Sequence, residues 1–224
     1  MCLAIYKPKG KKVTREALQN GFESNSDGAG FAVAVGGRIL IRKGFFTFDE
    51  FMAAWESFSD EAAVIHFRYA THGMIGEKNC HPFKVNGRAM VHNGILSIAS
   101  TEDSSDTAEF CRLVLRPLLA KVRADSPALR FLIEETIGAG NKIAILEPDG
   151  SATIYNEGCG IWHGGVWFSN SGFKRSQLEV FNWKNRWSDT RETEGAEIAA
   201  YMADGMTKED AEIAVWESQL YADS

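Results

Sequence analysis

Short turn signals between strand-like segments are the feature that most restricts how this chain can fold. Gly36-Gly37 separates two β-rich segments, and Asn86-Gly87 and Asp149-Gly150 do the same further along the chain. Two-residue turns of this kind join neighbouring strands that run in opposite directions. The sequence therefore predicts three antiparallel hairpins.

Helical patterns lie between and around these hairpins. Thr47 precedes an amphipathic segment and, with Glu50 three residues later, has the pattern of a capping box. Two further helices are expected from Asp106 and from Ser126-Pro127, and Pro117 should kink or restart the first of them. Strands that precede and follow a central helix pair indicate an α+β protein rather than alternating strand–helix–strand units.

The length and composition fit one globular domain with an extension. The chain has 224 residues and is 45% hydrophobic, which is enough for a full core. Near residue 173 the character changes, and tryptophans then occur among charged residues in a pattern of two acidic amphipathic helices. We expect a domain over residues 1–172 and a helical extension over 173–224 that packs on the domain or serves as a docking surface.

Charge and cysteine content limit the compartment and the partners. The net charge of −6 disfavours nucleic acid as a partner, and the one dense basic segment, residues 7–12, fits a solvated loop. No segment reaches the roughly 18 apolar residues that a membrane span needs, and the N-terminus lacks a secretory pattern. Four scattered cysteines are too few for a disulfide framework. We expect a cytoplasmic protein with free thiols and no membrane or nucleic-acid partner.

Polar and titratable residues gather where the predicted strands end. Arg68 ends one strand, Asn93-Gly94 ends another, and Asp106 lies at a helix N-terminus, where a carboxylate is a favourable cap. The two-pronged guanidinium of an arginine can bind the α-carboxylate of an amino-acid substrate, and an aspartate can bind its α-ammonium group. An Asn-Gly pair can aim donors at an oxyanion. Together with the thiol of Cys2 behind Met1, these groups are what a glutamine hydrolase requires.

Five short motifs occur in a fixed order between Cys2 and about Phe173. They are Cys2 behind the initiator methionine, His66–Gly73, Asn79–Phe83, His92-Asn93-Gly94 and Ser105-Asp106-Thr107. In type and order they resemble the class II glutamine amidotransferase domain of the N-terminal nucleophile hydrolases. The resemblance implies a four-layer αββα sandwich of two mostly antiparallel sheets. It implies neither a cofactor nor a metal.

The same resemblance implies roles for the matched residues. Cys2 would be the nucleophile once Met1 is removed, its freed α-amine would be the base, and a γ-glutamyl thioester would form with release of ammonia. Asn93 and Gly94 would hold the oxyanion. The implied substrate-binding residues are Arg68, Tyr69, Thr71, His72 and Asp106. Glutamine is the implied substrate, and a synthase or another acceptor enzyme is the implied partner.

One departure from the family pattern keeps other functions open. Glu23–Ser26 precede the Asp27–Gly30 turn, where the longer synthetases carry an arginine. In this respect the chain is closer to short, stand-alone members without a synthase domain, some of which hydrolyse other γ-glutamyl amides. A hydrolase of another γ-glutamyl amide is therefore one alternative. A catalytically silent module that senses glutamine is the other.

A cluster of histidines and one cysteine raises the alternative of a zinc site. Its members are His66, His72, Cys80, His81 and His92. Their spacings match no standard zinc pattern, so we expect no metal there. We interpret the histidines as structural residues or as parts of a loop over the substrate, and Gly73–Cys80 is the candidate lid.

Overall fold

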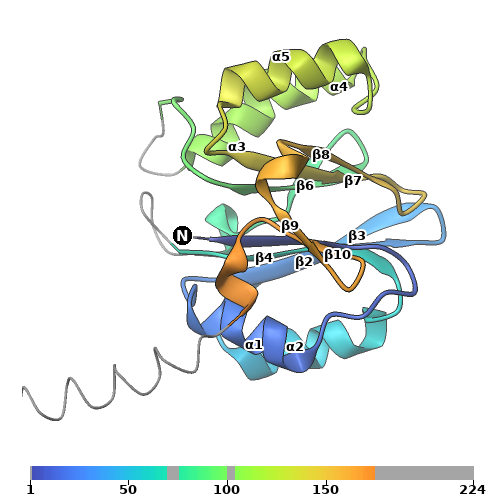
Figure 1. Ribbon diagram of the computed structural model, residues 1–224, viewed down its shortest axis with the longest axis vertical. Coiled ribbons are helices and arrows are strands. Elements are labelled where there is room, and N and C mark those ends of the chain that lie inside the picture. The colour runs from blue at the N-terminus through green and yellow to red at the C-terminus, as the bar shows by residue number, and fades with distance from the viewer. Residues whose placement is uncertain (1, 70–75, 100–103, 175–224) are drawn as a thin grey trace, which may run out of the picture. The chain divides into compact units, whose positions relative to one another are not determined.

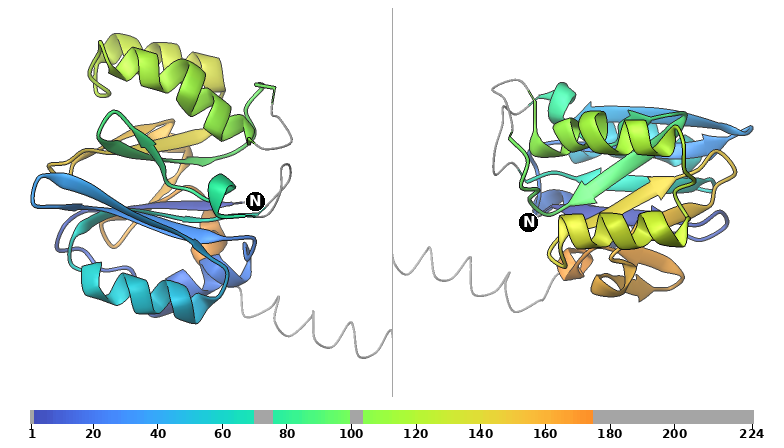
Figure 2. Two further views of the ribbon diagram at one scale, coloured as in Figure 1. Left: turned by 180° about the vertical axis from the view of Figure 1, so that it is seen from behind. Right: turned by 90° about the horizontal axis from the view of Figure 1, so that it is seen from above.

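Two β-sheets pack face to face between two layers of helices in the computed structural model of this chain (Figure 1). The structure describes residues 2–69, 76–99 and 104–174. The layers run helix, sheet, sheet, helix, and the left view of Figure 2 shows the same order from behind. The expected extension over residues 173–224 lies almost entirely outside the described residues, so it stays a prediction.

The larger sheet has six strands in the order β3-β2-β4-β1-β10-β9. These are β1 (Leu3–Lys7), β2 (Ala29–Val35), β3 (Arg38–Phe45), β4 (Ala62–Phe67), β9 (Ile161–His163) and β10 (Val166–Phe168). Every pair in it is antiparallel, and the central strand β4 is buried along its whole length.

The smaller sheet has four antiparallel strands in the order β5-β6-β7-β8. These are β5 (Phe83–Val85), β6 (Arg88–Asn93), β7 (Lys142–Leu146) and β8 (Ala152–Tyr155). The predicted turns at Gly36-Gly37 and Asn86-Gly87 each join two strands directly, and Asp149-Gly150 lies in the slightly longer β7–β8 connection. The prediction of an α+β fold with two antiparallel sheets is confirmed.

Helices cover the outer face of each sheet. The larger sheet is covered by α1 (Arg15–Glu23) and α2 (Phe48–Trp55), and the smaller one by α3 (Asp106–Phe110), α4 (Arg116–Leu119) and α5 (Pro127–Ile137) (Figures 1 and 2). Single turns of 3₁₀ helix occur at Glu56–Phe58, Glu77–Asn79, Glu157–Cys159 and Ser171–Phe173. Among the described residues, no helix is long and apolar enough to cross a membrane.

Side-chain size explains how the layers fit together. Small residues, among them Ala4, Ala32, Ala89 and Ala144, fill the space between the two sheets and let their backbones approach closely. Phenylalanines and other large apolar side chains instead fill the space between each sheet and its helices. The thin centre holds the two sheets in a fixed relation, which matters because the polar residues of the site come from both.

Local sequence signals mostly hold, with two corrections. Thr47 accepts a hydrogen bond from the Glu50 N–H at 3.3 Å, and the helix restarts at α4 after a π-helical turn, as expected from Pro117. The cap of α3, however, is Ser105 and not Asp106, because its hydroxyl accepts the Ala108 N–H at 3.2 Å.

The second correction concerns the basic segment 7–12. Lys7 is fully buried, and its ammonium donates to the Glu61 carbonyl at 2.6 Å. The burial lowers the pKa of Lys7, and the nearby acidic residues partly oppose that shift. The interpretation of this whole segment as a solvated loop was therefore wrong at its first residue, which belongs to β1 and ties it to the loop before β4.

Candidate active site

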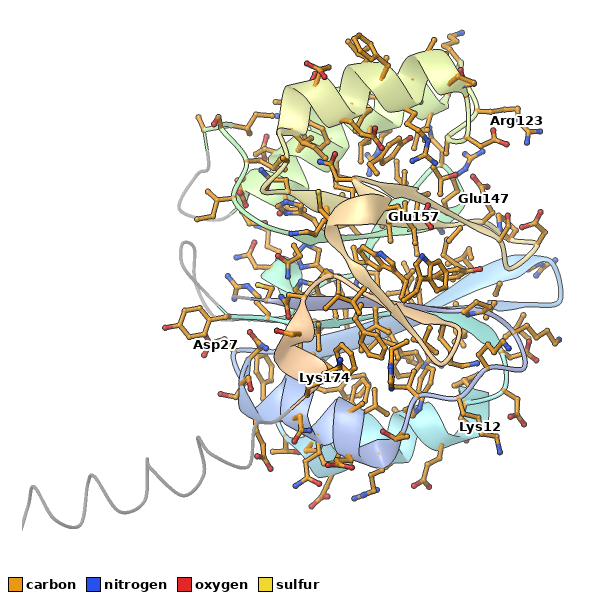
Figure 3. The ribbon with its side chains drawn as sticks, in the orientation of Figure 1. Lys12, Asp27, Arg123, Glu147, Glu157 and Lys174 are labelled. Atoms are coloured by element: carbon orange, nitrogen blue, oxygen red, sulfur yellow. The ribbon has the colours of Figure 1, made fainter. Side chains whose placement is uncertain are left out.

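Strand register brings Cys2 and Arg68 to the same end of the larger sheet. β1 and β4 pair Leu3 with Phe67, so the next residue beyond each strand, Cys2 and Arg68, lies at this common edge. On the other side of β4, the Arg68 N–H donates to the Gly28 carbonyl at 2.8 Å. The Asp27 N–H donates to the Arg68 carbonyl at 3.0 Å, and Figure 3 shows the Asp27 side chain at this edge.

The thiol of Cys2 lies against the backbone of Tyr69. The Tyr69 N–H donates to Sγ at 3.2 Å, and Sγ lies 3.4 Å from the Tyr69 carbonyl oxygen, where it can donate. Burial raises the pKa of the Cys2 thiol, while the Tyr69 N–H and the charge of Arg68 act in the opposite direction. The neutral thiol is thus favoured, and nucleophilic attack needs a base to take its proton.

Two asparagine amides hold the backbone carbonyl of Cys2. The side-chain N–H₂ groups of Asn93 and Asn170 both donate to this oxygen, the latter at 2.8 Å. Asn93 also donates to Ser169 Oγ at 2.9 Å, and the same oxygen accepts the Ala4 N–H at 2.9 Å. The start of β1 is therefore fixed from the ends of β6 and β10, which lie in different sheets.

Sequence reasoning did not single out Ser169 and Asn170. They follow β10 directly, and β10 pairs with β1 through Ile5 and Phe168, which brings both residues beside Cys2. The only available signal was a Ser-Asn pair at the end of a buried apolar strand, the same signal that pointed to Asn93.

The structure places Asn93 on the Cys2 backbone, and its oxyanion role stays a prediction. Both amide hydrogens of Asn93 have acceptors in the folded chain, Cys2 O and Ser169 Oγ. Gly94 follows with φ +138° and lies against Asn141. Catalytic hydrogen bonds often reach their final geometry only when the substrate is bound, so the proximity of Asn93 to Cys2 is the relevant observation.

The structure describes Arg68, Tyr69 and Asp106 among the predicted substrate-binding residues. Arg68 is only 4% exposed, whereas the Tyr69 side chain is 51% exposed. Asp106 begins α3, where Oδ2 accepts the Leu96 N–H at 2.8 Å and Oδ1 accepts the Thr107 N–H at 2.7 Å. These bonds fix the carboxylate while each oxygen keeps a further lone pair. Thr71 and His72 lie outside the described residues.

Three buried histidines lie behind this edge, and the ring of His92 is on the face of the smaller sheet that the helices cover. His66 and His81 have ring centroids 4.0 Å apart, and His66 Nε2 lies 2.9 Å from the His92 carbonyl. Burial lowers the pKa of His66 to about 3, and it also lowers the pKa of His81 and of His92. The rings are therefore neutral at physiological pH. Among the described residues, no group of three potential ligands could hold a metal ion.

We expect His81→Leu to reduce the acid sensitivity of the fold. A histidine whose folded pKa is depressed binds its proton preferentially in the unfolded state, where the pKa is about 6.5. Its contribution to stability is complete above that value and is lost as the pH falls toward the folded pKa, at about 1.4 kcal/mol per pH unit. Between pH 6.5 and 5, the free energy of unfolding measured in urea should therefore fall by about 2 kcal/mol less for the variant than for the wild type.

The matched control for that experiment is His163→Gln. His163 is an exposed histidine on β9, so its replacement should leave the wild-type pH dependence in place. Neither ring nitrogen of His81 has a partner among the described residues, so the leucine variant should also fold normally at pH 7. An unchanged acid dependence in His81→Leu would show that His81 is not held neutral by the fold.

A second cluster of charged residues lies at the opposite edge, around a cavity of about 280 Å³. Figure 3 shows Arg123 and Glu147 there, far from Asp27. Arg88 pairs with Glu147 at 2.7 Å, and Arg123 pairs with Asp125 at 2.7 Å. Because these charges pair with one another, we interpret the cluster as a structural group of ion pairs and not as a second binding site.

Comparison with known proteins identifies several similar sequences, although no family model matches the chain. A glutamine–fructose-6-phosphate aminotransferase of Rhizobium meliloti (strain 1021) is 32% identical over 152 residues, which cover 62% of this chain and 25% of that protein. The enzyme of the same name from Caulobacter vibrioides is 26% identical over 156 residues, covering 60% and 26%. The chain thus spans about a quarter of the length of these relatives.

Among solved structures, the glutamine phosphoribosylpyrophosphate amidotransferase of B. subtilis, complexed with ADP and GMP, matches 75% of this chain and 40% of its own. The sequence identity is 19% and the TM-score is 0.48. The sequence motifs, the two antiparallel sheets between helices and the similar sequences agree with one another. Over the matched region the chain is similar to glutamine–fructose-6-phosphate aminotransferases, in agreement with the resemblance of its motifs to the class II glutamine amidotransferase domains.

Proposed function

We propose that this protein hydrolyses the side-chain amide of glutamine with the thiol of Cys2 and releases ammonia. The observation that carries the proposal is the position of Cys2, whose Sγ lies against Tyr69 while its carbonyl is held by Asn93. The backbone of Arg68 lies beside Cys2 at the end of β4, which supports a role for its guanidinium in binding a carboxylate near that thiol. The candidate nucleophile and carboxylate clamp thus lie at one edge of the larger sheet, and the candidate oxyanion donor reaches Cys2 from the smaller sheet.

The base for Cys2 would be its own α-amine, which removal of Met1 would free. An ordinary thiol is only about 3% ionised at pH 7, whereas an α-amine of pKa about 8 is about 10% neutral. Burial raises the pKa of the Cys2 thiol further, so proton transfer during attack matters more here than in an exposed cysteine. The amine would take the thiol proton and later give it to the leaving ammonia.

The reaction would proceed in two halves. Sγ would attack the amide carbon, and the negative oxygen of the tetrahedral intermediate would accept hydrogen bonds from the Asn93 side chain and the Gly94 N–H. Breaking the C–N bond would release ammonia and leave a γ-glutamyl thioester on Cys2. Water would then hydrolyse the thioester to glutamate and restore the thiol.

Recognition of the amino-acid end of glutamine would use opposite charges. Arg68 would bind the α-carboxylate through its two-pronged guanidinium, and Asp106 would bind the α-ammonium. The neutral state of His66 and His92 supports this assignment, because neither buried ring adds a competing positive charge near the site. Tyr69, Thr71 and His72 are the further binding residues proposed from the family motif.

Mass spectrometry of the purified protein tests the nucleophile directly. We expect the mass of a chain that has lost Met1, and a single covalent adduct on Cys2 after treatment with the glutamine analogue diazo-oxo-norleucine. The exposed thiol of Cys159 provides an internal control for non-specific alkylation. Retention of Met1, or adducts shared equally between Cys2 and Cys159, would contradict the proposal.

A substrate panel separates glutamine hydrolysis from the two alternatives. We expect the highest kcat/KM for glutamine when ammonia or amine release is measured for glutamine and for other γ-glutamyl amides. A hydrolase of another γ-glutamyl amide would prefer a different member of the panel. A sensing module would bind glutamine in calorimetry but release no ammonia from any member.

The ammonia acceptor is proposed to be a separate enzyme that docks on residues 173–224. The acidic, tryptophan-bearing segment has a composition suited to an interface. We expect affinity capture with the full chain to retrieve an ammonia-using enzyme that a chain ending at residue 174 does not. Identical partners for both chains would contradict this role.

A further inference from the structure

The imidazole of His92 connects two parts of the site through its two nitrogens. Nδ1 lies 2.8 Å from Thr107 Oγ1 on α3, and Nε2 lies 2.9 Å from Asn141 Oδ1 just before β7. The ring is buried, with 2% of its surface exposed. Neither contact is part of the mechanism described above.

Asn141 determines which ring nitrogen carries the proton. The Asn141 side-chain N–H₂ group donates to the Ile137 carbonyl at 2.7 Å, so its oxygen is the atom that faces His92. An amide oxygen only accepts hydrogen bonds, and His92 Nε2 must therefore be the N–H donor. The neutral ring then has a bare Nδ1, which accepts the Thr107 hydroxyl.

The Thr107 contact affects the neighbouring carboxylate. A threonine hydroxyl has one hydrogen, and two acceptors lie within reach of it, His92 Nδ1 at 2.8 Å and Asp106 Oδ1 at 3.3 Å. The Thr107 hydroxyl donates its hydrogen in the shorter contact, to His92 Nδ1, because that ring nitrogen has no other donor. His92 thus draws the Thr107 hydroxyl away from Asp106 and leaves a lone pair on the carboxylate for an ammonium.

The Asn141 contact affects the other end of the site. Gly94 is packed against Asn141 so closely that a Cβ on Gly94 would overlap the Asn141 side-chain amide. The position of that amide is set by its bonds to His92 and Ile137. His92 therefore fixes, through Asn141, the surface on which the Gly94 backbone rests.

His66 adds a link to the opposite sheet. Its Nε2 donates to the His92 carbonyl at 2.9 Å, so the β4 strand that precedes Arg68 is tied to β6 directly before Asn93. A carbonyl oxygen accepts only, so His66 also carries its proton on Nε2.

We propose that His92 is a positioning residue that, as its Nε2–H tautomer, sets the Gly94 backbone through Asn141 and frees the Asp106 carboxylate through Thr107. This inference rests on the proposed function, because it assigns the Asn141 contact to the oxyanion end of the site and the Thr107 contact to the ammonium end. It predicts that the two contacts can be removed separately, with different kinetic results.

Two near-isosteric substitutions separate the contacts. His92→Gln keeps a donor near the Nε2 position and loses the acceptor for Thr107, so KM for glutamine should rise about tenfold with kcat little changed. His92→Asn keeps an acceptor near the Nδ1 position and loses the donor for Asn141, so kcat should fall about 10- to 100-fold with KM little changed. Thr107→Val should reproduce the effect of His92→Gln, and the double variant should add nothing further.

A purely structural role would give a different pattern. Both His92 variants would then lower the thermal midpoint and would change kcat and KM in the same sense. Two variants that shift the same constant would overturn the inference, and so would additive effects of His92→Gln and Thr107→Val.

The tautomer can be read without any activity. ¹⁵N NMR of the histidine rings should show His92 and His66 as neutral Nε2–H forms, and Thr107→Val should leave the His92 proton on Nε2. A His92 proton found on Nδ1 would overturn the inference even in an active enzyme. Absence of ammonia release from every panel substrate would instead refute the proposed function. In that case two measurements would decide the positioning role of His92: the NMR tautomer and glutamine binding to the Cys2→Ala variant.

Discussion

Cys2→Ala should abolish release of ammonia from glutamine, with a loss of at least about 10⁴ in kcat, because removing the nucleophile leaves only substrate binding and oxyanion stabilisation. The fold should survive. Cys2 lies outside β1, and the contacts that anchor it, from Asn93 and Asn170, go to its backbone carbonyl and not to the thiol. Coupled ammonia detection and thermal unfolding on the same sample measure both quantities.

Cys159→Ala is the matched control for this experiment. Its thiol is exposed in the 3₁₀ turn before β9, remote in sequence from every proposed site residue, and its loss should leave kcat and KM at the wild-type values. Glutamine binding should persist in Cys2→Ala, because Arg68 and Asp106 are both retained. Full activity in Cys2→Ala would overturn the assignment of the nucleophile.

The arrangement of charges explains why a small zwitterion is a suitable substrate. The titratable groups of His66, His81 and His92 are buried and neutral, so the proposed binding charges in the described part of the site are the Arg68 guanidinium and the Asp106 carboxylate. Their signs match the two ends of an amino acid. In a buried site a low local dielectric strengthens each of these contacts.

The sequence predicted those parts of the fold that depend on neighbouring residues. The turns at Gly36-Gly37 and Asn86-Gly87 set the antiparallel pairs because a two-residue turn brings its flanking strands side by side in opposite directions. The start of α2 at Thr47 follows from one hydroxyl and one backbone N–H. Such features need no knowledge of the rest of the chain.

Residues brought in by long-range register could not be predicted in the same way. Asn170 reaches the Cys2 carbonyl across 168 positions, and Asn141 reaches His92 across 49. Their sequence neighbourhoods are ordinary polar turns, and only the pairing of β10 with β1 and the packing of α5 reveal their place. The family motifs identified Cys2, Arg68 and Asn93, but they contain neither Asn141 nor Asn170.

Gly94→Ala should lower both activity and stability. Gly94 has φ +138°, a conformation that L-residues rarely adopt, and an added Cβ would lie 3.0 Å from Asn141 Cα and overlap its side-chain amide. Because backbone cannot yield as a flexible side chain can, we expect a loss of about 2–4 kcal/mol in the free energy of unfolding. If the Gly94 N–H is an oxyanion donor, kcat should also fall, by up to about the 10²- to 10³-fold that loss of such a donor costs, because the overlap with Asn141 displaces the backbone that carries this N–H.

Gly140→Ala provides the control within the same stretch of chain as Asn141. A Cβ at Gly140 meets no atom within 4 Å, and its φ lies outside the region that disfavours L-residues, so activity and stability should stay close to those of the wild type. Urea unfolding and kcat measured on both variants separate the two effects. If Gly94→Ala is less stable but keeps full kcat, the role of Gly94 is structural only. A reduced kcat in the folded variant would instead place the Gly94 backbone at the reacting carbonyl.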